Sequence, residues 1–577
     1  MTRDHDRDSV RFDYDWVVVG SGFGGSVSAL RLSEKGYRVA VLEAGRRFAD
    51  EDFARSTWNL RRFLWMPVLG LRGIMRIYTF KDVWILAGAG IGGGSLVYAG
   101  TLYQPGEAFF SAPEWSELED WQRALGPHDA EARRTLGAAS IPFRTDANDL
   151  LQLVGECMGV GDSYQRPEVS VFFGEEGEEG TTVADPFFGG EGPQRTACTR
   201  CGSCMIGCRL GAKNTLVKNY LHFAGHNGTE ILPERTVKEI RPLGAEDGSD
   251  GYAITSARSG AWVRKRRETI TARGVVIAAG AIGTNTLLAR AKHTGMLPRL
   301  SDRVVAQVRT NSEALLAVTA KDDSHDFADS VAITSSIYPD PNTHIENVSY
   351  GHGGGFMGLL FTMLTGAGTR LTRPLRLVGQ VLRHPATGFR LATRRGSWSR
   401  RTIILLVMQT LPGSLSLKAL RVGKRLMLTT RQDPQHPVPT FIPAANHAAE
   451  ILASEIGGVA QSNLPEALLN TPATAHILGG AVIGADPEHG VVDRHQRAFG
   501  YHNLLVCDGS VLPANPGVNP SLTITALAEP AMNHVPRPPR LTTSSTRHTQ
   551  ATPRHAAATE RRPPALAPFS SRRRPAA

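Results

Sequence analysis

Three glycines near the start of the chain are spaced for phosphate binding. Gly20, Gly22 and Gly25 form the pattern Gly-x-Gly-x-x-Gly. In this pattern the first glycine makes a tight turn, the second lets a pyrophosphate approach the backbone, and the third lets a helix pack on a strand. Glu43 lies 18 residues beyond Gly25, where a carboxylate can bind the hydroxyls of a ribose. These residues predict a dinucleotide site, and the acid favours a ribose without a phosphate.

Four of the six cysteines lie within eleven residues. Cys198, Cys201, Cys204 and Cys208 form Cys-x2-Cys-x2-Cys-x3-Cys, the spacing of bacterial ferredoxin ligands. Arg209 follows the last cysteine where those ferredoxins have proline, and the chain has no second motif of this kind. Three interpretations stay open: an iron–sulfur cluster, a structural zinc site, and reduced thiols in a tight loop.

Three polar residues have roles that depend on their surroundings. His476 lies in Thr-Ala-His-Ile-Leu-Gly-Gly, Asn519 in Gly-Val-Asn-Pro-Ser, and Glu346 in Asn-Thr-His-Ile-Glu-Asn. Taken alone, the histidine is typical of a buried structural residue and the asparagine of a turn before proline. The glutamate is typical of a surface carboxylate on a strand. In an apolar pocket beside a reactive cofactor, a histidine or a glutamate can serve as a base, and an asparagine can serve as a hydrogen-bond donor.

The elements around the first glycines form a β-α-β pattern. Residues 15–19 are an apolar run suited to a buried parallel strand, and Val27, Leu30 and Leu32 continue as a helix. A second apolar strand is predicted at 38–42. Strand, glycines, helix, strand and acid therefore follow one another in the order of a Rossmann unit.

Three further segments extend this pattern. A second glycine run includes Gly92, Gly93, Gly94 and Ser95, and it indicates either a backbone wrapped against a large ligand or a flexible loop. An apolar strand ends at Gly280, and another ends at Asp508 and Gly509 before a helix that begins near Ser521.

Together, these four elements resemble the glucose–methanol–choline (GMC) family of FAD oxidoreductases. Within that family the chain is similar to bacterial cholesterol oxidases of the non-secreted type. The resemblance covers about residues 13–534. It rests on the strings VVGSGFGGSVSALRLSEKGYRVAVLEAG, AGAGIGGGSLVYA, GCRLGAKNTLVKNYL, TAHILGGAVIG and DGSVLPANPGVNPSLTITALAE.

The resemblance implies an α/β fold with two domains. A Rossmann-type FAD-binding domain is assembled from discontinuous segments, and a sheet-based α+β domain binds the substrate. We expect the FAD-binding domain at 13–105, 205–310 and 470–535. We expect the substrate-binding domain at 106–204 and 311–469, with the cysteine-rich loop at 198–208.

The resemblance also assigns residues to the cofactor. Glu43 binds the adenosine ribose, Val237 packs near the adenine, and Asp508 approaches the ribityl chain and pyrophosphate. The expected FAD-binding residues are Gly20, Ser21, Gly22, Phe23, Gly24, Gly25, Glu43, Gly92, Gly93, Gly94, Ser95, Val237, Asp508 and Gly509.

The same resemblance gives the three polar residues catalytic roles. His476 faces the flavin and handles the proton of the substrate hydroxyl, and Asn519 is a second polar group at the flavin edge. Glu346 aligns loosely with a carboxylate that moves a proton from C4 to C6 of a steroid, converting the Δ5 ketone to the Δ4 form. A desolvated glutamate has the raised pKa that such a shuttle requires.

The expected function is FAD-dependent oxidation of a hydrophobic secondary alcohol: the 3-hydroxyl of cholesterol or a related sterol, with or without Δ5-to-Δ4 isomerisation. The electron acceptor is oxygen or another molecule. The alternative is a GMC-type dehydrogenase of another hydrophobic alcohol that passes electrons to a non-oxygen acceptor, through an iron–sulfur cluster or directly to a soluble acceptor. A flavin-binding protein without turnover is a third hypothesis, and the presence of both His476 and Asn519 argues against it.

Charge and hydropathy bear on partners and location. Residues 537–577 contain nine arginines and one glutamate, so most of the net charge of +10 belongs to a Pro-rich tail at 536–577, predicted to be disordered. A nucleic-acid partner is therefore not expected. Residues 1–16 lack the apolar stretch of a secretory signal, and no apolar run reaches about 18 residues. The expected location is cytoplasmic.

One internal segment has a composition that is compatible with peripheral membrane contact. Residues 370–401 contain nine arginines and no acid, interleaved with Leu, Val and Phe. The segment is either a solvated basic surface or an interfacial segment that docks on anionic lipid. Pro374 and Pro385 are expected to break any long helix there.

Overall fold

The structure is a computed structural model, and it describes residues 12–538 except 262–265, 394–395 and 423–424. The described residues up to Arg537 belong to one compact unit. The tail predicted at 536–577 lies outside the described residues from 539 onward. The division into FAD-binding and substrate-binding domains stays a prediction.

A seven-stranded sheet carries the predicted Rossmann unit. Its order is β11-β2-β1-β14-β13-β12, with β26 beside β14. The strands β11, β2, β1, β14 and β26 pair in parallel, whereas β12, β13 and the first part of β14 form an antiparallel meander. The bounds are β1 Tyr14–Val19, β2 Val39–Leu42, β11 Glu230–Leu232, β12 Arg235–Pro242, β13 Tyr252–Arg258, β14 Arg267–Ile277 and β26 Leu504–Val506. This topology confirms the α/β fold predicted from the sequence.

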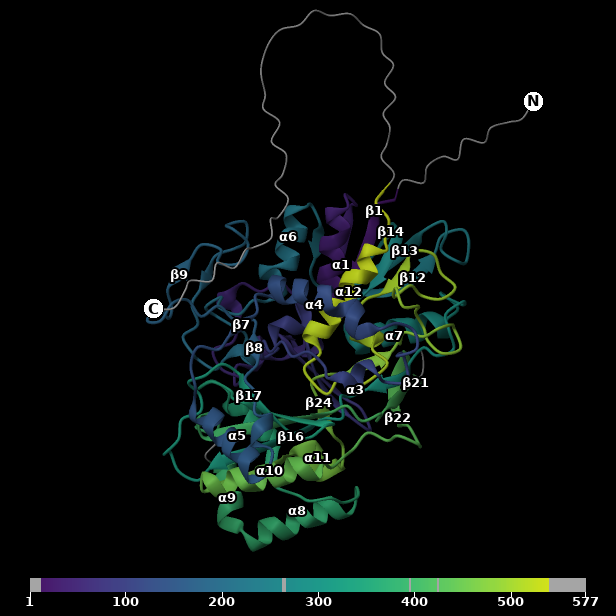
Figure 1. Ribbon diagram of the computed structural model, residues 1–577. Helices are drawn as coiled ribbons and strands as arrows, with labels where there is room; N and C mark the ends of the chain where they lie inside the picture. The colour runs from purple at the N-terminus through teal and green to yellow at the C-terminus, as the bar shows by residue number, and fades with distance from the viewer. Residues whose placement is uncertain (1–11, 262–265, 394–395, 423–424, 539–577) are drawn as a thin grey trace, which may run out of the picture. The chain divides into compact units, whose positions relative to one another are not determined.

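Apolar side chains cover both faces of this sheet. Val17 and Val19 of β1 join one hydrophobic cluster, while Trp16 and Val18 join another, because successive strand residues point to opposite faces. Helix α7 lies on the first face and α1, α4, α6 and α12 lie on the second (Figure 1). Their bounds are α1 Phe23–Glu34, α4 Trp121–Leu136, α6 Tyr220–His226, α7 Gly280–His293 and α12 Ser521–Asn533.

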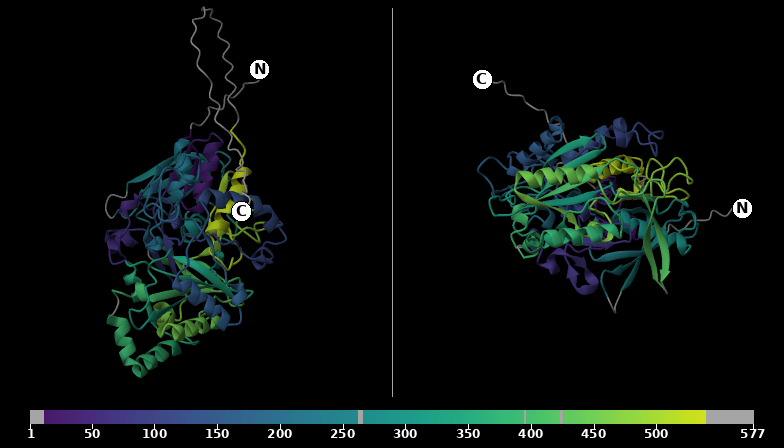
Figure 2. Two further views of the ribbon diagram at one scale, coloured as in Figure 1. Left: turned by 60° about the vertical axis from the view of Figure 1, so that its left-hand side comes forward. Right: turned by 90° about the horizontal axis from the view of Figure 1, so that it is seen from below.

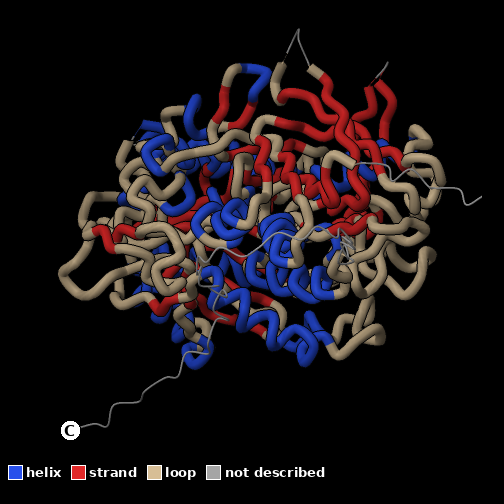
Figure 3. Tube along the Cα trace, turned by 90° about the horizontal axis from the view of Figure 1, so that it is seen from above, coloured by secondary structure: helices blue, strands red, loops and turns tan. Residues whose placement is uncertain are grey.

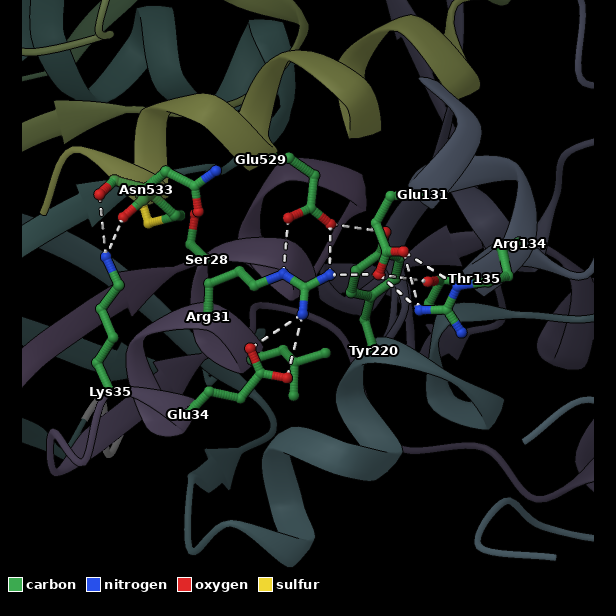
Figure 4. A network of polar contacts seen from close by, with 12 residues as sticks. Ser28, Arg31, Glu34, Lys35, Glu131, Arg134, Thr135, Tyr220, Glu529 and Asn533 are labelled. Atoms are coloured by element: carbon green, nitrogen blue, oxygen red, sulfur yellow. Dashed lines mark hydrogen bonds and ion pairs between the residues drawn. The ribbon is translucent and has the colours of Figure 1, made fainter. Parts of the chain in front are cut away.

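A network of polar contacts ties the helices of the second face together (Figure 4). Arg31 of α1 forms ion pairs with Glu529 of α12 at 2.6 Å and with Glu131 of α4 at 2.8 Å. The hydroxyl of Tyr220, on α6, donates to the same Glu529 at 2.9 Å. Four helices from distant parts of the chain are therefore fixed around one guanidinium group.

A second sheet has six antiparallel strands in the order β17-β18-β20-β16-β23-β19. Helices α5 and α10 pack on one face, and the other face turns apolar residues of β16, β17, β18 and β20 toward the cavity described below. The bounds are α5 Asp146–Cys157, β16 Ala314–Ala320, β17 Ile333–Asp340, β18 Thr343–Val348, β19 Phe361–Met363, β20 Thr402–Gln409, α10 Pro443–Glu455 and β23 Gly458–Asn463.

Smaller sheets lie at either side of His476. A four-stranded sheet has the order β22-β21-β15-β25, and a three-stranded sheet has the order β24-β6-β5. Their bounds are β5 Met75–Thr79, β6 Trp84–Gly88, β15 Ala306–Arg309, β21 Leu415–Val422, β22 Arg425–Gln432, β24 Ala473–Thr474 and β25 Leu478–Gly480. His476 is thus held between the ends of β24 and β25.

The remaining elements are short or peripheral, and loops and turns make up much of the chain between the main helices and strands (Figure 3). They are α2 Leu60–Phe63, β3 Trp65–Met66, β4 Leu71–Arg72, α3 Glu107–Phe110, β7 Ala139–Ser140, β8 Glu168–Val169, β9 Thr182–Val183, β10 Arg195–Thr196, α8 Thr372–Arg383, α9 Pro385–Thr393 and α11 Leu464–Leu469. Pro385 does separate two helices, as expected. Pro374 does not break one, because it lies in the first turn of α8, where its missing N–H costs no hydrogen bond.

Candidate active site

One cavity of about 430 Å³ joins the two sheets. Its lining includes Gly20, Gly22 and Glu43 from the Rossmann unit, together with His476 and Asn519. The rest of its wall is largely apolar, and from the second sheet it includes Leu315, Ile333, Val348, Phe361, Ile404 and Leu406. Most of the predicted cofactor residues therefore share one cavity with two of the predicted catalytic residues, His476 and Asn519, whereas Glu346 does not line it.

The first glycines play different parts in shaping that space. A Cβ at Gly20 would lie 2.2 Å from the carbonyl oxygen of Ala278, and one at Gly25 would lie 2.2 Å from that of Gly20. A Cβ at Gly24 would lie 1.9 Å from the carbonyl oxygen of Cys507. Gly22 has no such neighbour within 4 Å and lines the cavity. Three glycines thus let α1 pack on the sheet, and Gly22 leaves its backbone open to a ligand.

Glu43 lines the cavity at the end of β2. Its Oε2 accepts hydrogen bonds from the backbone N–H of Ser21 at 3.1 Å and from the hydroxyl of Ser21 at 2.7 Å. Its Oε1 accepts a hydrogen bond from the N–H of Gly45 at 2.7 Å. The carboxylate is therefore fixed beside the phosphate turn, where a ribose hydroxyl would donate to it.

The second glycine run lies directly against the first. A Cβ at Gly93 would lie 2.7 Å from Cα of Gly22. Gly93 and Gly94 line the cavity, whereas Gly92 and Ser95 support them from behind. The Ser95 hydroxyl donates to the carbonyl of Gly92 at 2.7 Å. The run is thus held in shape by its own hydrogen bonds.

The other predicted cofactor residues also border the cavity: Phe23, Val237, Asp508 and Gly509. Burial raises the pKa of Asp508. Its carboxylate accepts hydrogen bonds from the Thr284 hydroxyl at 2.5 Å and from the N–H of Ser510 at 2.8 Å. These residues form a dinucleotide cradle in which Gly22 leaves its backbone open to a ligand and the Glu43 carboxylate is held in place. The cradle fits FAD.

His476 is oriented by a carboxylate that the sequence analysis did not identify. Nδ1 of His476 forms a short hydrogen bond with Oε1 of Glu313, and the other oxygen of Glu313 accepts the N–H of Ala475 at 2.8 Å. Glu313 is fully buried. Within the part of the chain that the structure describes, Nε2 of His476 has no hydrogen bond. A histidine with Nδ1 held in this way presents Nε2 as the reactive nitrogen.

The turn before Glu313 is locked to the loop before Asn519. Asn311 has a φ of 56° and Ser312 a φ of 46°, a left-handed conformation that non-glycine residues rarely adopt. The Asn311 amide donates to the carbonyl of Val518 at 3.0 Å and accepts the N–H of Gly517 at 2.9 Å. The two loops that deliver His476's partner and Asn519 are therefore joined.

Glu346 lies buried on β18, so the surface-carboxylate interpretation is wrong. The amide nitrogen of Asn519 donates to Oε2 of Glu346 at 3.2 Å. Burial raises the pKa of Glu346 to about 8, and the negative charge of Glu313 adds to the shift. Oε1 of Glu346 and Oδ1 of Asn519 have no hydrogen-bond partner among the described residues. Val348, two residues along the same face of β18, lines the cavity.

His344 continues this buried face of β18 and was also missed from the sequence. It stacks on Tyr338 with ring centroids 4.4 Å apart and meets the edge of Tyr103 at 4.8 Å. Burial lowers the pKa of His344 to about 3, so the ring is neutral at physiological pH. The surroundings of Glu346 are therefore aromatic and uncharged on this side.

The four clustered cysteines line a separate, much smaller cavity together with Lys213. Burial raises the pKa of Cys204 to about 11 and that of Cys198 as well, which favours the thiol forms. Across residues 12–538, outside the gaps, no group of three or more His, Cys, Asp or Glu side chains is arranged to hold a metal ion. The structure therefore gives no support for a bound metal at these cysteines, and the iron–sulfur, zinc and reduced-thiol interpretations stay predictions.

Lys213 connects the cysteine loop to the cavity. Its ammonium group donates to the carbonyl oxygens of Cys204 at 2.6 Å, Leu96 at 3.0 Å and Tyr98 at 3.2 Å. Tyr98 and Met205 line the main cavity. The cysteine-rich loop thus supports the segment that follows the second glycine run.

A dinucleotide cradle and an apolar wall that border one cavity, together with a histidine and an asparagine, define an oxidoreductase that holds cofactor and substrate together. Comparison with known proteins agrees. Residues 192–295 and 424–528 match the GMC oxidoreductase family, and residues 18–49 match the NAD(P)-binding Rossmann-like domain.

The chain is 49% identical over 530 residues to a cholesterol oxidase of Mycobacterium tuberculosis, an alignment that covers 90% of each chain. It is 44% identical over 532 residues to a cholesterol oxidase of Acinetobacter baumannii, covering 91% of this chain and 95% of the relative. A solved pyridoxine 4-oxidase from Mesorbium loti shares the fold, with a TM-score of 0.58 at 17% identity over 90% of this chain and 99% of that one. The chain therefore belongs to the GMC oxidoreductase family, and it is an FAD-dependent oxidoreductase acting on CH–OH groups.

None of the helices in the described parts of the chain has the length and apolar composition needed to cross a bilayer.

Proposed function

We propose that this protein oxidises the 3-hydroxyl of cholesterol or a related sterol to the ketone, with oxygen as the electron acceptor. The observation that carries the proposal is that His476 and Asn519 line the same cavity as the dinucleotide cradle and a largely apolar wall. Identities of 49% and 44% to proteins named cholesterol oxidase support the substrate and the acceptor. An insoluble sterol resides in lipid, so we also propose that the protein meets it at a membrane surface.

The cofactor would be held by the residues that border the cradle. Gly22, with no protein atom near a Cβ built on it, would leave room for the pyrophosphate at the start of α1, Glu43 would accept the ribose hydroxyls, and Gly93 and Gly94 would border the flavin. When bound, FAD supplies the acceptor for the hydride that leaves the carbinol carbon.

His476 takes the hydroxyl proton. With Nδ1 engaged by Glu313, Nε2 accepts the proton of the sterol hydroxyl, and the buried carboxylate of Glu313 stabilises the imidazolium that results. Asn519 lines the same cavity, and we propose that it positions the sterol oxygen. Glu313 acts through His476 and is a positioning residue.

Glu346 is proposed to move the double bond after oxidation. A proton next to the new carbonyl is acidic, so a carboxylate can remove it from C4 and return it at C6, which converts the Δ5 ketone to the Δ4 ketone without gain or loss of atoms. A pKa raised by burial makes the carboxylate a stronger base than an exposed one. Asn519 holds one of its oxygens and leaves the other unpartnered among the described residues.

Product analysis tests this function. The purified holoprotein is incubated with cholesterol in air, and the ketosteroid and hydrogen peroxide are quantified. The proposal expects one peroxide for each ketone formed. Formation of ketone without peroxide would point to another acceptor, and absence of any 3-ketone from a protein that retains FAD would overturn the sterol assignment.

A further inference from the structure

Helix α8 presents an apolar stripe to solvent. Leu371, Leu375, Val378 and Leu382 have exposed fractions of 80%, 70%, 54% and 75%. They are spaced by four, three and four residues, so they lie along one face of the helix. The opposite face is buried through Arg373 and Leu377. The helix is therefore amphipathic with part of its apolar surface turned outward.

Helix α9 extends this outward surface. Phe389 has an exposed fraction of 71%, while Leu391 packs inward with Met363, Leu377 and Ala467. Figure 1 and the left view of Figure 2 both place α8 and α9 at the periphery of the fold. We call residues 371–393 the α8–α9 hairpin.

Cations accompany the exposed apolar side chains. Arg376, Arg383 and Arg390 are exposed, and none of them has an ion pair or hydrogen bond within the described residues. No acidic residue occurs from 370 to 401. Outward leucines among unpaired arginines complement an anionic lipid surface, where acyl chains take the apolar groups and phosphates take the guanidinium groups. Two copies of this chain facing each other here would bring like charges together.

The hairpin is anchored to residues that adjoin the cavity wall. Arg373 forms an ion pair with Glu466 of α11 and donates to the carbonyl of Thr440 at 2.6 Å. Glu466 in turn accepts a hydrogen bond from the amide of Asn463 at 2.8 Å. Asn463 and Pro465 line the cavity.

A second connection runs through β19. Phe361 at the start of this strand lines the cavity, and Met363 at its end packs beneath the hairpin. The α8–α9 hairpin and the wall of the cavity are therefore connected through β19.

We infer that the α8–α9 hairpin docks this protein on anionic phospholipid bilayers and places the adjoining cavity wall toward the lipid surface. The identity of the molecule that passes from the bilayer into the cavity rests on the proposed function. The docking itself does not, because it depends only on the exposed leucines and arginines.

Flotation with vesicles tests the docking in the absence of sterol. The full-length holoprotein is mixed with vesicles of phosphatidylcholine alone or with phosphatidylglycerol added. The variants are L375Q/L382Q, which keeps helix propensity, and R376E/R383E. The matched control is R123E/R273E, which makes the same charge change on α4 and β14, away from the hairpin (Figure 1). The basic tail is common to all of them.

The wild type and R123E/R273E are expected to bind the anionic vesicles alike, with binding reversed by salt. Each hairpin variant should bind the anionic vesicles at least about tenfold more weakly than the wild type. Equal binding by all four proteins would overturn the proposal. So would a wild-type dimer that L375Q/L382Q converts to monomer while vesicles bind neither protein, because the hairpin would then be a dimer interface.

An activity comparison keeps the two proposals distinguishable. With sterol delivered in cyclodextrin the hairpin variants should match the wild type, and with sterol in anionic vesicles their apparent KM should rise while kcat is retained. Vesicle binding without any sterol oxidation would contradict the proposed function alone. Sterol oxidation that is equally efficient from vesicles in all variants would contradict the docking proposal alone.

Discussion

Glu313 and His476 are 163 positions apart in the chain, yet Nδ1 of the histidine is hydrogen-bonded to the buried carboxylate. The carboxylate follows a turn in which Asn311 and Ser312 adopt positive φ. Hydrogen bonds from that turn reach the loop that carries Asn519. The carboxylate therefore engages Nδ1 and leaves Nε2 of the histidine for the substrate, and the segment that carries Glu313 is joined to the loop that carries Asn519.

Replacing Glu313 by Gln should slow oxidation while the substrate still binds. An amide keeps the shape of the side chain but cannot stabilise an imidazolium, so the rate of anaerobic flavin reduction should fall by about 100-fold or more. The measurement is stopped-flow flavin reduction, with KM determined in parallel. A large rise in KM with an unchanged limiting rate would show that Glu313 serves substrate binding instead.

Alanine at Gly22 should impair FAD binding, whereas alanine at Gly24 should impair folding stability. A methyl group at Gly22 meets no protein atom within 4 Å, so Gly22→Ala should fold normally and lose FAD because the methyl occupies the space next to the phosphates. Gly24→Ala would place Cβ 1.9 Å from the carbonyl of Cys507 and should lower the thermal stability of the protein. Thermal unfolding and flavin content check both variants, each serving as the control for the other.

Glu346→Gln should separate the two proposed activities. Oxidation should continue while the Δ5 ketone accumulates, because the amide cannot carry the proton from C4 to C6. In the wild type the isomerisation rate should rise with pH through about 8, as the carboxyl loses its proton. Chromatography of the products at several pH values follows both steps. Undiminished formation of the Δ4 ketone by the variant would assign the proton transfer to another group.

The same variant should alter how stability depends on pH. The pKa of Glu346 is raised in the folded protein to about 8 from the model-peptide value of 4.5. Between these values the folded state binds the proton more tightly than the unfolded state, so this group lowers stability as pH rises through that window. The Tm of Glu346→Gln relative to wild type should therefore increase from pH 5 to pH 8. A constant Tm difference would mean that the carboxyl is not desolvated.

The local parts of this fold could be predicted because they depend on neighbours in sequence. The strand, glycines and helix from β1 to α1 carry their own pattern, and the roles of Gly20 and Gly25 follow from turns and packing within that unit. His476 and Asn519 were identified by resemblance, and the structure places both at one cavity.

What could not be predicted depends on contacts between distant segments. Nothing in Asn-Ser-Glu marks Glu313 as the partner of a histidine, and the alternation of β18 does not reveal that Glu346 and His344 face inward. The spacing of the cysteines suggested ligands, but burial raises the pKa of Cys198 and of Cys204 and favours their protonated thiols. Pro374 looked like a helix breaker because its position in the first turn was not known.

Anaerobic addition of cholesterol to the FAD-loaded protein tests the central claim most directly. If His476 and Asn519 present the sterol hydroxyl to the flavin as proposed, the visible absorbance of the flavin should bleach, one 3-ketosteroid should form for each flavin, and His476→Ala should slow the bleaching by about 100-fold or more. An unchanged flavin spectrum in the wild type with cholesterol and related sterols, or bleaching at the wild-type rate by His476→Ala, would contradict the account.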